Sequence, residues 1–332
     1  MSKLAVIGGG AWGTALASLA CEAAPDGALT LLWARNETVV TDINEGRGNP
    51  TYLPDVALSS ALRATSDLAD AVSDADIVLL VTPAQALRGI ARALAAHLAP
   101  GAALVVCAKG IEQGSLKPMT TVLAEEVPGY PALVLSGPTF AREAALGRPT
   151  AFVLAGRDRT VVERVSARIA LPTFRPYISE DVVAVEMGGA IKNVLAIACG
   201  IVAGRDLGEN AKAALITRGL AEVTRLIVAL GGQMETVQGL SGLGDLVLTA
   251  GSLQSRNMSL GHALGEGKSL EEVLGSRRSV TEGVWTAAAI THMARQHGVD
   301  MPICSAVNAI VTEGEDIGEV IDGLLSRPLT EE

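Results

Sequence analysis

A glycine-rich turn between an apolar run and an apolar helix constrains the fold of this chain more than any other feature. Residues 4–7 are apolar, and residues 8–13 follow with the pattern G-x-G-x-x-G. Residues 14–24 are rich in Ala and Leu, which favours a helix, and residues 28–33 form a second apolar run. Strand, turn, helix and second strand make a βαβ unit, which is the context that a dinucleotide-binding fingerprint requires.

Each glycine of the pattern has a chemical role. Gly8 allows the chain to turn off the strand, Gly10 lets the backbone approach a pyrophosphate, and Gly13 lets the helix pack closely on the sheet. The N-terminus of the helix that follows the turn supplies free backbone N–H groups that can bind phosphate, and we expect Ala11 of the turn to contact the cofactor. The alternative is a glycine-rich turn that binds no ligand.

The end of the second apolar run bears on which dinucleotide binds. NAD-selective folds usually carry an acid about 20 residues after the glycines, which accepts a hydrogen bond from the ribose 2′-hydroxyl. Here the run ends in Trp33-Ala34-Arg35, with no acid at Ala34. Arg35 is placed to meet a 2′-phosphate, so the sequence predicts that NADPH is preferred over NADH. The alternative is an ordinary exposed arginine in a loop.

Predicted strands and helices alternate through the first half of the chain. Each strand is an unbroken apolar run, which is typical of a mostly parallel sheet covered by helices on both faces. Long helical stretches follow after residue 180, where only residues 246–248 leave strand or helix open. We therefore predict an α/β Rossmann domain with a doubly wound sheet over residues 1–179, and an all-α domain over residues 180–332. Further strands are predicted at 77–81, 103–107, 133–135, 151–154 and 173–177, and helices at 85–98 and 117–127.

Composition and charge argue against several classes of partner. The net charge of −10 and the pI near 5.0 disfavour nucleic acid or an anionic membrane as the main partner. The four cysteines and four histidines lack metal-ligand spacing, so we expect no metal site and reduced thiols, as in a cytoplasmic protein. We also expect no secretory leader. The many small residues allow a homodimer through the helical domain without requiring one.

One apolar stretch, residues 187–204, is long enough to raise the question of a membrane span. Lys192 and Asn193 lie inside it together with several glycines. These residues favour a buried helix, and we predict no stable membrane insertion.

Lys192 is the best candidate for proton transfer. A Rossmann half followed by a helical half suggests hydride transfer, which needs a group that gives or takes a proton. Lys192 is the only cation between Arg175 and Arg205. Burial disfavours the charged amine, so we expect the pKa of Lys192 to fall toward neutrality. The alternative is a structural lysine that pairs with Glu186 or extends toward solvent.

Other polar residues stand in small or apolar surroundings. Asp245, in a glycine-lined segment, is suited to fix Lys192 or a substrate hydroxyl, with a local Asx turn as the alternative. The run Ser255-Arg256-Asn257 is suited to clamp a phosphate, with a solvated loop as the alternative. Lys109 and residues 136–141 directly follow predicted strands, which places them at the ligand-binding edge of the sheet.

Several segments, in this order, match one known family. They are residues 8–17, Lys109-Gly110, 136–141, 189–194, 210–222, 242–249 and 255–257. Over nearly its whole length the chain resembles bacterial NAD(P)-dependent glycerol-3-phosphate dehydrogenase. It departs from the usual pattern of that family at Ala108, Ala250-Gly251 and Val307-Asn308.

The resemblance implies reversible hydride transfer between NAD(P)H and dihydroxyacetone phosphate, giving sn-glycerol 3-phosphate for glycerophospholipid synthesis. It implies that Lys192 and Asp245 are catalytic, and that the helical domain resembles the 6-phosphogluconate dehydrogenase C-terminal type. The substrate contacts that it implies are Lys109, Gly137, Thr139, Lys192, Asp245, Ser255, Arg256 and Asn257. Besides the glycine-rich turn, the cofactor contacts are Trp12, Arg35, Lys109, Ala141, Arg256, Val280 and Glu282.

Two other functions stay open at the level of sequence. One is a related two-domain dehydrogenase that acts on a β-hydroxy or keto acid. Ser255-Arg256-Asn257 favours a phosphorylated substrate over a bare carboxylate. The other is a protein that senses a dinucleotide without turning it over, and such a protein would not require a buried lysine opposite the nicotinamide.

Overall fold

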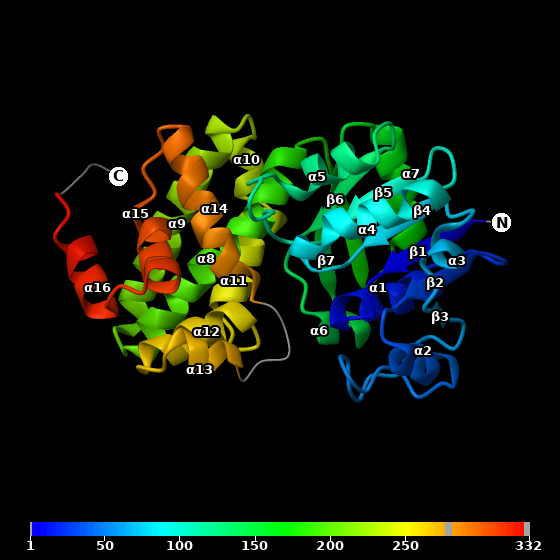
Figure 1. The fold of residues 1–332 in the computed structure, drawn as a ribbon, viewed down its shortest axis with the longest axis horizontal. Helices are drawn as coiled ribbons and strands as arrows, with labels where there is room; N and C mark the ends of the chain where they lie inside the picture. The colour runs from blue at the N-terminus through cyan, green and yellow to red at the C-terminus, as the bar shows by residue number, and fades with distance from the viewer. Residues whose placement is uncertain (1, 276–280, 329–332) are drawn as a thin grey trace. The chain divides into compact units, whose positions relative to one another are not determined.

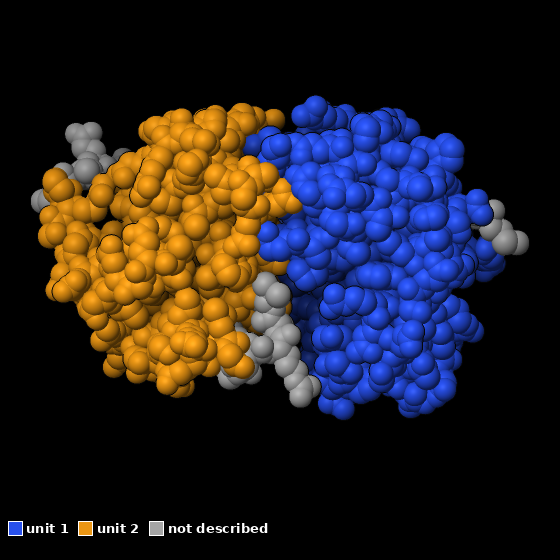
Figure 2. Space-filling model, viewed as in Figure 1, with its two compact units in different colours: residues 1–109, 117–186 blue, residues 110–116, 187–332 orange. Residues whose placement is uncertain are grey.

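The computed structural model describes residues 2–275 and 281–328 of the chain (Figure 1). It divides into two compact units, coloured separately in Figure 2. Unit 1 comprises residues 1–109 and 117–186, and unit 2 comprises residues 110–116 and 187–332. The domain boundary placed at residue 179 from the sequence stays a prediction.

Unit 1 is built around a sheet of eight strands in the order β3-β2-β1-β4-β5-β6-β7-β8. The strands are β1 (Lys3–Ile7), β2 (Leu29–Trp33), β3 (Arg63–Thr65), β4 (Ile77–Leu80), β5 (Ala103–Val106), β6 (Ala132–Ser136), β7 (Thr150–Gly156) and β8 (Phe174–Ser179). The first six are parallel, in the order of a doubly wound dinucleotide-binding sheet. β7 runs antiparallel to β6, and β8 runs parallel to β7. The predicted mostly parallel Rossmann sheet is confirmed.

One strand of this sheet was not predicted. β3 has three residues, and only Ala64 among them is buried. Such a short segment carries no apolar run, so its strand conformation depends on pairing with β2.

The helices of unit 1 sort by their contacts into two groups. They are α1 (Ala11–Glu22), α2 (Glu37–Asn44), α3 (Leu68–Val72), η1 (Ala84–Ala86), α4 (Leu87–Leu94), η2 (Ala95–His97), α5 (Met119–Glu126), α6 (Ala141–Ala145) and α7 (Arg159–Ile169). α1 packs against α6 and α7, while α4 packs against α3 and α5. Two groups are what a sheet covered on both faces requires.

A buried arginine fixes α7 to the region around α1. Arg168 is 6% exposed and donates to the backbone oxygen of Ala20 at 2.7 Å and to Thr30 Oγ1 at 3.0 Å. Burial lowers the pKa of Arg168. A cation at the carbonyl end of α1 complements the helix dipole and anchors the helix that follows the glycine-rich turn.

Residues 187–275 and 281–328 of unit 2 form helices and connecting loops without a strand, as predicted. The helices are α8 (Val182–Gly204, shared with unit 1), α9 (Gly208–Ala229), α10 (Met234–Val237), η3 (Leu240–Gly244), α11 (Asp245–Ala250), α12 (Arg256–Gly265), α13 (Leu270–Gly275), α14 (Glu282–Gln296), α15 (Pro302–Asn308), η4 (Ala309–Glu313) and α16 (Ile317–Leu325). Residues 246–248, which the sequence left open, lie in α11 and are therefore helical.

The long apolar helix α8 is the core helix of unit 2. Among the described residues it is the one helix long and apolar enough to cross a membrane, and 89% of its apolar window is buried inside the fold. Its glycines allow close packing against α12. A Cβ on Gly200 would lie 2.2 Å from the backbone oxygen of Met258, and one on Gly261 would lie 2.0 Å from that of Ile197. The sequence prediction of a buried helix is confirmed.

The four cysteines are free thiols, as predicted. Cys107, Cys199 and Cys304 are buried, and Cys21 is half-buried. Burial raises the pKa of Cys199 to about 12, and it raises the pKa of the other three thiols as well. These thiols are therefore protonated and poor nucleophiles near neutral pH.

Candidate active site

Residues 8–13, called here the glycine turn, lead from β1 into the first turn of α1. Two of these residues have no room for a side chain. Gly8 has a φ of +133°, and a Cβ there would lie 2.6 Å from the backbone oxygen of Val81. A Cβ on Gly13 would lie 1.8 Å from the backbone oxygen of Gly8. The tight turn and the close helix–sheet packing that the motif predicts are both present.

Gly10 differs from the other two glycines because its surroundings are open. It is the N-cap of α1, and a Cβ built there would meet no atom of the described residues within 4 Å. The first turn of α1 carries no acidic residue. An open backbone at the positive end of a helix fits a pyrophosphate group, so the turn passes a structural test for a dinucleotide.

Arg35 stands just beyond the end of β2. Its side chain is exposed and forms no hydrogen bond or ion pair with any other described residue. The neighbouring Ala34 is buried against the glycine turn, where a Cβ on Gly9 would lie 2.5 Å from the Ala34 Cβ. The guanidinium is therefore available to a ligand, while its preference for a 2′-phosphate stays a prediction.

Three predicted substrate contacts come together at the ends of β5 and β6. The ammonium of Lys109 donates to the backbone oxygen of Gly137 at 2.9 Å, and Thr139 Oγ1 donates to the same oxygen at 3.2 Å. Gly137 has a φ of +145°, and a Cβ there would lie 2.9 Å from the Phe152 Cα. Glycine is thus required for β6 to turn this close to β7.

The predicted cofactor contacts at the start of α1 share one cluster with Ala141. Ala11, Trp12 and Ala141 all pack against the same small core around Leu53 and Val56. The buried indole nitrogen Nε1 of Trp12 has no hydrogen-bond partner among the described residues. A buried donor without a partner is unusual and is consistent with a ligand contact.

In unit 2, Lys192 lies in a buried hydrogen-bonded cluster with Asp245 and Thr249, called here the lysine site. Lys192 Nζ donates to Asp245 Oδ1 at 2.6 Å and to Thr249 Oγ1 at 2.7 Å. The exposed fractions of the two charged side chains are 10% and 1%. Burial disfavours the ammonium and the carboxylate favours it, so the predicted fall in the pKa of Lys192 stays a prediction.

The structure does not favour the structural alternative for Lys192. Glu186, the proposed partner, instead accepts hydrogen bonds from the backbone nitrogen of Thr120 at 2.8 Å and from Thr120 Oγ1 at 2.5 Å. Burial raises the pKa of Glu186, although its bonds to Thr120 oppose this effect. Lys192 is paired with Asp245 and does not extend into solvent, so its ammonium has one fixed position.

A tight helical turn sets the position of Asp245. The π-helical segment η3 ends directly before this residue, and a Cβ on Gly242 would lie 1.9 Å from the backbone oxygen of Val237. Gly242 therefore allows α10 and η3 to pack closely. The carboxylate at the first residue of α11 then faces Lys192.

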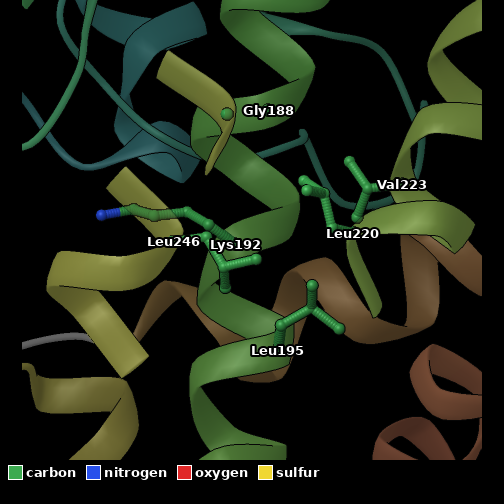
Figure 3. Close-up of a pocket in the computed structure, with 7 residues that line it drawn as sticks. Gly188, Lys192, Leu195, Leu220, Val223 and Leu246 are labelled. Atoms are coloured by element: carbon green, nitrogen blue, oxygen red, sulfur yellow. The ribbon is translucent and has the colours of Figure 1, made fainter. Parts of the chain in front are cut away.

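A small cavity of about 10 Å³ lies beside Lys192 and has room for about one water molecule. Its walls include Leu220 and Val223 of α9. In Figure 3 the nitrogen of Lys192 points away from these two side chains. The aliphatic part of Lys192 therefore lines the cavity, while its ammonium belongs to the lysine site.

The run Ser255-Arg256-Asn257 forms the start of α12. Ser255 is the N-cap and accepts a hydrogen bond from the backbone nitrogen of Met258 at 3.2 Å. Ser255 and Asn257 are buried, whereas Arg256 is exposed. The solvated-loop alternative is therefore wrong for Ser255 and Asn257. Arg256 at a helix N-terminus remains well placed to bind an anion.

Asn257 connects three helices. Its Nδ2 donates to Asn193 Oδ1 at 2.9 Å, and its Oδ1 accepts from the backbone nitrogen of Gly283 at 3.1 Å. Glu282, a predicted cofactor contact, is the first residue of α14 and thus adjoins this network. Val280, the other cofactor contact predicted there, lies outside the described residues.

Two residues close to the predicted sites were missed by sequence reasoning. Thr249 follows Asp245 by four residues on α11, a helical spacing that could have revealed it. Asn49 is buried and donates to the glycine turn from 40 positions away in sequence, which no local pattern indicates.

Comparison with known proteins identifies the family. The sequence model of the family "NAD-dependent glycerol-3-phosphate dehydrogenase N-terminus" matches residues 3–162. The sequence model of the family "NAD-dependent glycerol-3-phosphate dehydrogenase C-terminus" matches residues 181–322. Glycerol-3-phosphate dehydrogenase [NAD(P)+] from Parvibaculum lavamentivorans is 53% identical, covering 99% of this chain and 98% of that protein. Its counterpart from Rhodospirillum rubrum is 54% identical, covering 99% and 93%.

A solved structure agrees with these relatives. The crystal structure of glycerol-3-phosphate dehydrogenase from Coxiella burnetii has a TM-score of 0.92 and 35% identity, and the match covers 98% of this chain and 99% of that one. Both family models, the full-length relatives and this fold agree. The chain therefore belongs to the NAD-dependent glycerol-3-phosphate dehydrogenase family.

Proposed function

We propose that this protein reduces dihydroxyacetone phosphate to sn-glycerol 3-phosphate with NAD(P)H, and catalyses the reverse reaction, for glycerophospholipid synthesis. The observation that carries the proposal is the buried contact of Lys192 with Asp245 and Thr249. It gives unit 2 a proton donor at a fixed position. The relatives named above support the same substrate and cofactor class.

The residues that would hold the dinucleotide lie in the glycine turn and beyond the strand ends. The open backbone at Gly10 and the amides of Ala11, Trp12 and Gly13 would bind the pyrophosphate. When bound, the reduced cofactor supplies the hydride that reduces the substrate carbonyl. The further contacts proposed for the cofactor are Gly8, Arg35, Lys109, Ala141, Arg256, Val280 and Glu282.

Lys192 has the proton-transfer role in this proposal. As the carbonyl carbon gains a hydride, its oxygen gains negative charge and takes a proton from the Lys192 ammonium. The neutral amine then recovers a proton from solvent. Asp245 and Thr249 hold the nitrogen in place, and the negative charge of Asp245 stabilises the ammonium before transfer. In the reverse direction Lys192 accepts the proton of the alcohol.

The phosphate and hydroxyl groups of the substrate need several polar contacts. Arg256 combines an exposed guanidinium with a helix N-terminus, which suits a phosphate dianion. Lys109 contributes a second cation next to Gly137 and Thr139. With Lys192, Asp245, Ser255 and Asn257, these residues make up the proposed substrate contacts.

We also propose that Arg35 makes the protein prefer NADPH over NADH. Since its guanidinium is exposed and has no partner among the described residues, it can pair with a 2′-phosphate. We expect kcat/KM for NADPH to exceed that for NADH, and Arg35→Ala to reduce the difference. A strong preference of the wild type for NADH would refute this role.

A spectrophotometric assay tests the proposed function. Oxidation of NADPH and of NADH is followed by the absorbance of the reduced nicotinamide, with dihydroxyacetone phosphate as substrate. The proposal predicts turnover with this substrate and none with unphosphorylated β-keto acids. Turnover of a keto acid alone would favour a related dehydrogenase, and dinucleotide binding without any turnover would favour a sensor.

The cellular location, the partners and the oligomeric state of the protein are also part of the proposal. The negative net charge and the reduced thiols support a cytoplasmic enzyme without a nucleic-acid partner and without stable membrane insertion. A homodimer fits the small residues of the helical unit. Sedimentation at micromolar concentration would distinguish a dimer from a monomer.

A further inference from the structure

A segment between α2 and β3 packs along α1 and contacts the glycine turn. This segment, residues 49–59, is called here the strap. Leu53 and Val56 of the strap bury their side chains against Ala15 of α1. Farther along, the backbone nitrogen of Ser59 donates to Ser18 Oγ at 2.9 Å. The strap is therefore fixed to α1 at more than one point.

Asn49 begins the strap and uses its amide group fully. Its Nδ2 donates to the backbone oxygen of Gly9 at 3.0 Å and to Thr14 Oγ1 at 2.8 Å. Its Oδ1 accepts from the backbone nitrogen of Tyr52 at 3.2 Å. That backbone N–H can only donate, which fixes which end of the amide faces the glycine turn. Asn49 is 1% exposed, so water has little access to its amide group.

The bond to Gly9 restrains one peptide plane of the glycine turn. The oxygen of Gly9 and the N–H of Gly10 belong to the same peptide, which is planar and trans, so they point in opposite directions. Asn49 holds the oxygen on the buried side. The Gly10 N–H therefore points away from Asn49, and it belongs to a residue whose Cβ position has no described atom within 4 Å.

Glycine makes this restraint necessary. Gly9 and Gly10 lack the Cβ atoms that limit backbone rotation, so the peptide between them can turn at low cost. A peptide that had turned over would present its oxygen to the phosphate and repel it. A buried donor on the oxygen opposes that rotation before any ligand arrives.

We propose that Asn49 is a positioning residue that orients the Gly9–Gly10 peptide for binding the pyrophosphate of the dinucleotide. The inference rests on the proposed function only in requiring that a dinucleotide binds to the glycine turn. Other residue types fit the site less well. Aspartate has no N–H to donate, serine is too short to reach Gly9 and Tyr52 together, and leucine has the branching of asparagine without its polar atoms.

The test compares binding of two probes to the full-length protein. NADPH contains a pyrophosphate, and adenosine 2′-phosphate does not. Dissociation constants are measured by calorimetry for the wild type, Asn49→Ala and Asn49→Leu. The matched control is Ser18→Ala, which removes another hydrogen bond between α1 and the strap, at the buried Ser18, without touching the glycine turn.

We expect both Asn49 variants to raise the Kd for NADPH about tenfold or more, and the Kd for adenosine 2′-phosphate less than about twofold. The Ser18→Ala variant should leave both constants within about twofold of the wild type. At saturating NADPH, kcat of Asn49→Leu should stay within about threefold, since the lysine site is intact. Melting curves of the free proteins identify any variant that fails to fold, and Asn49→Leu keeps the number and branching of the side-chain heavy atoms.

Two results would overturn the inference. In the first, Asn49→Leu and Ser18→Ala weaken NADPH binding equally, so that Asn49 only holds the strap. In the second, adenosine 2′-phosphate is weakened as much as NADPH, so that the effect does not concern the pyrophosphate. If the wild type fails to bind NADPH, the proposed function fails and this inference fails with it.

Discussion

The glycine turn of unit 1 and the lysine site of unit 2 differ in the groups that they offer to a ligand. The glycine turn presents backbone groups, and its residues are defined by the side chains that they lack. The lysine site presents side chains from α8 and α11, and its residues are defined by charge and hydrogen bonding. Substitutions in the first should therefore act through space and backbone shape, and those in the second through charge.

This contrast predicts the largest effect at Asp245. Asp245→Ala removes the carboxylate but leaves a buried ammonium, so unfolding free energy should fall by about 3–5 kcal/mol and turnover by about 100-fold or more. Denaturant titration and steady-state kinetics measure the two effects. The control is Asp300→Ala, whose side chain is 69% exposed in an ion pair with Arg327, and it should cost less than about 1 kcal/mol. Equal losses in both variants would contradict the buried-pair account.

The second prediction separates two glycines of the same turn. Gly13→Ala places a methyl group against the Gly8 oxygen, so it should lower unfolding free energy by about 1–3 kcal/mol and weaken NADPH binding. In Gly10→Ala the added methyl group meets no atom of the described residues within 4 Å, so the variant should weaken NADPH binding with stability changed by less than about 0.5 kcal/mol. Calorimetric binding and chemical denaturation check both. A marked stability loss in Gly10→Ala would show that its surroundings are not open.

The third prediction concerns pH and a carboxyl outside both sites. Glu222 is buried on α9 and accepts from the backbone nitrogens of Ile303 and Cys304 at 2.9 and 3.2 Å. Burial raises its pKa to about 7, above that of an unfolded glutamate near 4.3. The folded state then holds a proton that the unfolded state releases, so stability should fall as pH rises from about 4.3 through 7.

Urea unfolding between pH 5 and pH 8 measures this effect. In the wild type, the free energy of unfolding should fall by about 2 kcal/mol over that interval because of Glu222. In the Glu222→Gln variant this fall should be absent. The exposed Glu209, which is 89% exposed, provides the control variant Glu209→Gln, whose pH slope should match the wild type. If the unfolding free energy of Glu222→Gln depends on pH as strongly as that of the wild type, the proton held by the folded state is bound to another residue.

The smallest expected effect is at Thr249. Thr249→Val keeps the shape of the side chain and removes one hydrogen bond to Lys192, so kcat should fall about tenfold, equivalent to about 1.4 kcal/mol. Thr291→Val is the control, because among the described residues the hydroxyl of this buried threonine bonds only to the backbone oxygen of Ala287 in its own helix. Stopped-flow or steady-state rates distinguish them, and equal rates for both variants would remove Thr249 from the lysine site.

The two sites also differ in how far the sequence could predict them. The glycine turn is formed by residues adjacent in sequence, and the spacing of its glycines within a βαβ unit predicts its backbone conformation. The fold and the roles of Gly8 and Gly13 could therefore be predicted from the sequence pattern. Lys192 could be singled out as a lone cation in an apolar helix. Its partner could not be assigned, because Glu186 and Asp245 were both compatible with the sequence and only tertiary packing brings Asp245 to it.

Long-range contacts account for what the sequence did not show. Asn49 reaches the glycine turn through the strap, and β3 becomes a strand only by pairing with β2. Asn257 looked like part of a polar loop, although it is buried where α8, α12 and α14 meet. In each case the residue type allowed several environments, and the environment was chosen by distant parts of the chain.

The most direct test of the central claim measures turnover and cofactor binding together in Lys192→Met, with Lys268→Met as an exposed control. If the two sites divide the work as described, kcat with dihydroxyacetone phosphate falls by about 1,000-fold while the Kd for NADPH stays within about twofold. Near-normal turnover in Lys192→Met, or a loss of NADPH binding as large as the loss of turnover, would contradict the account.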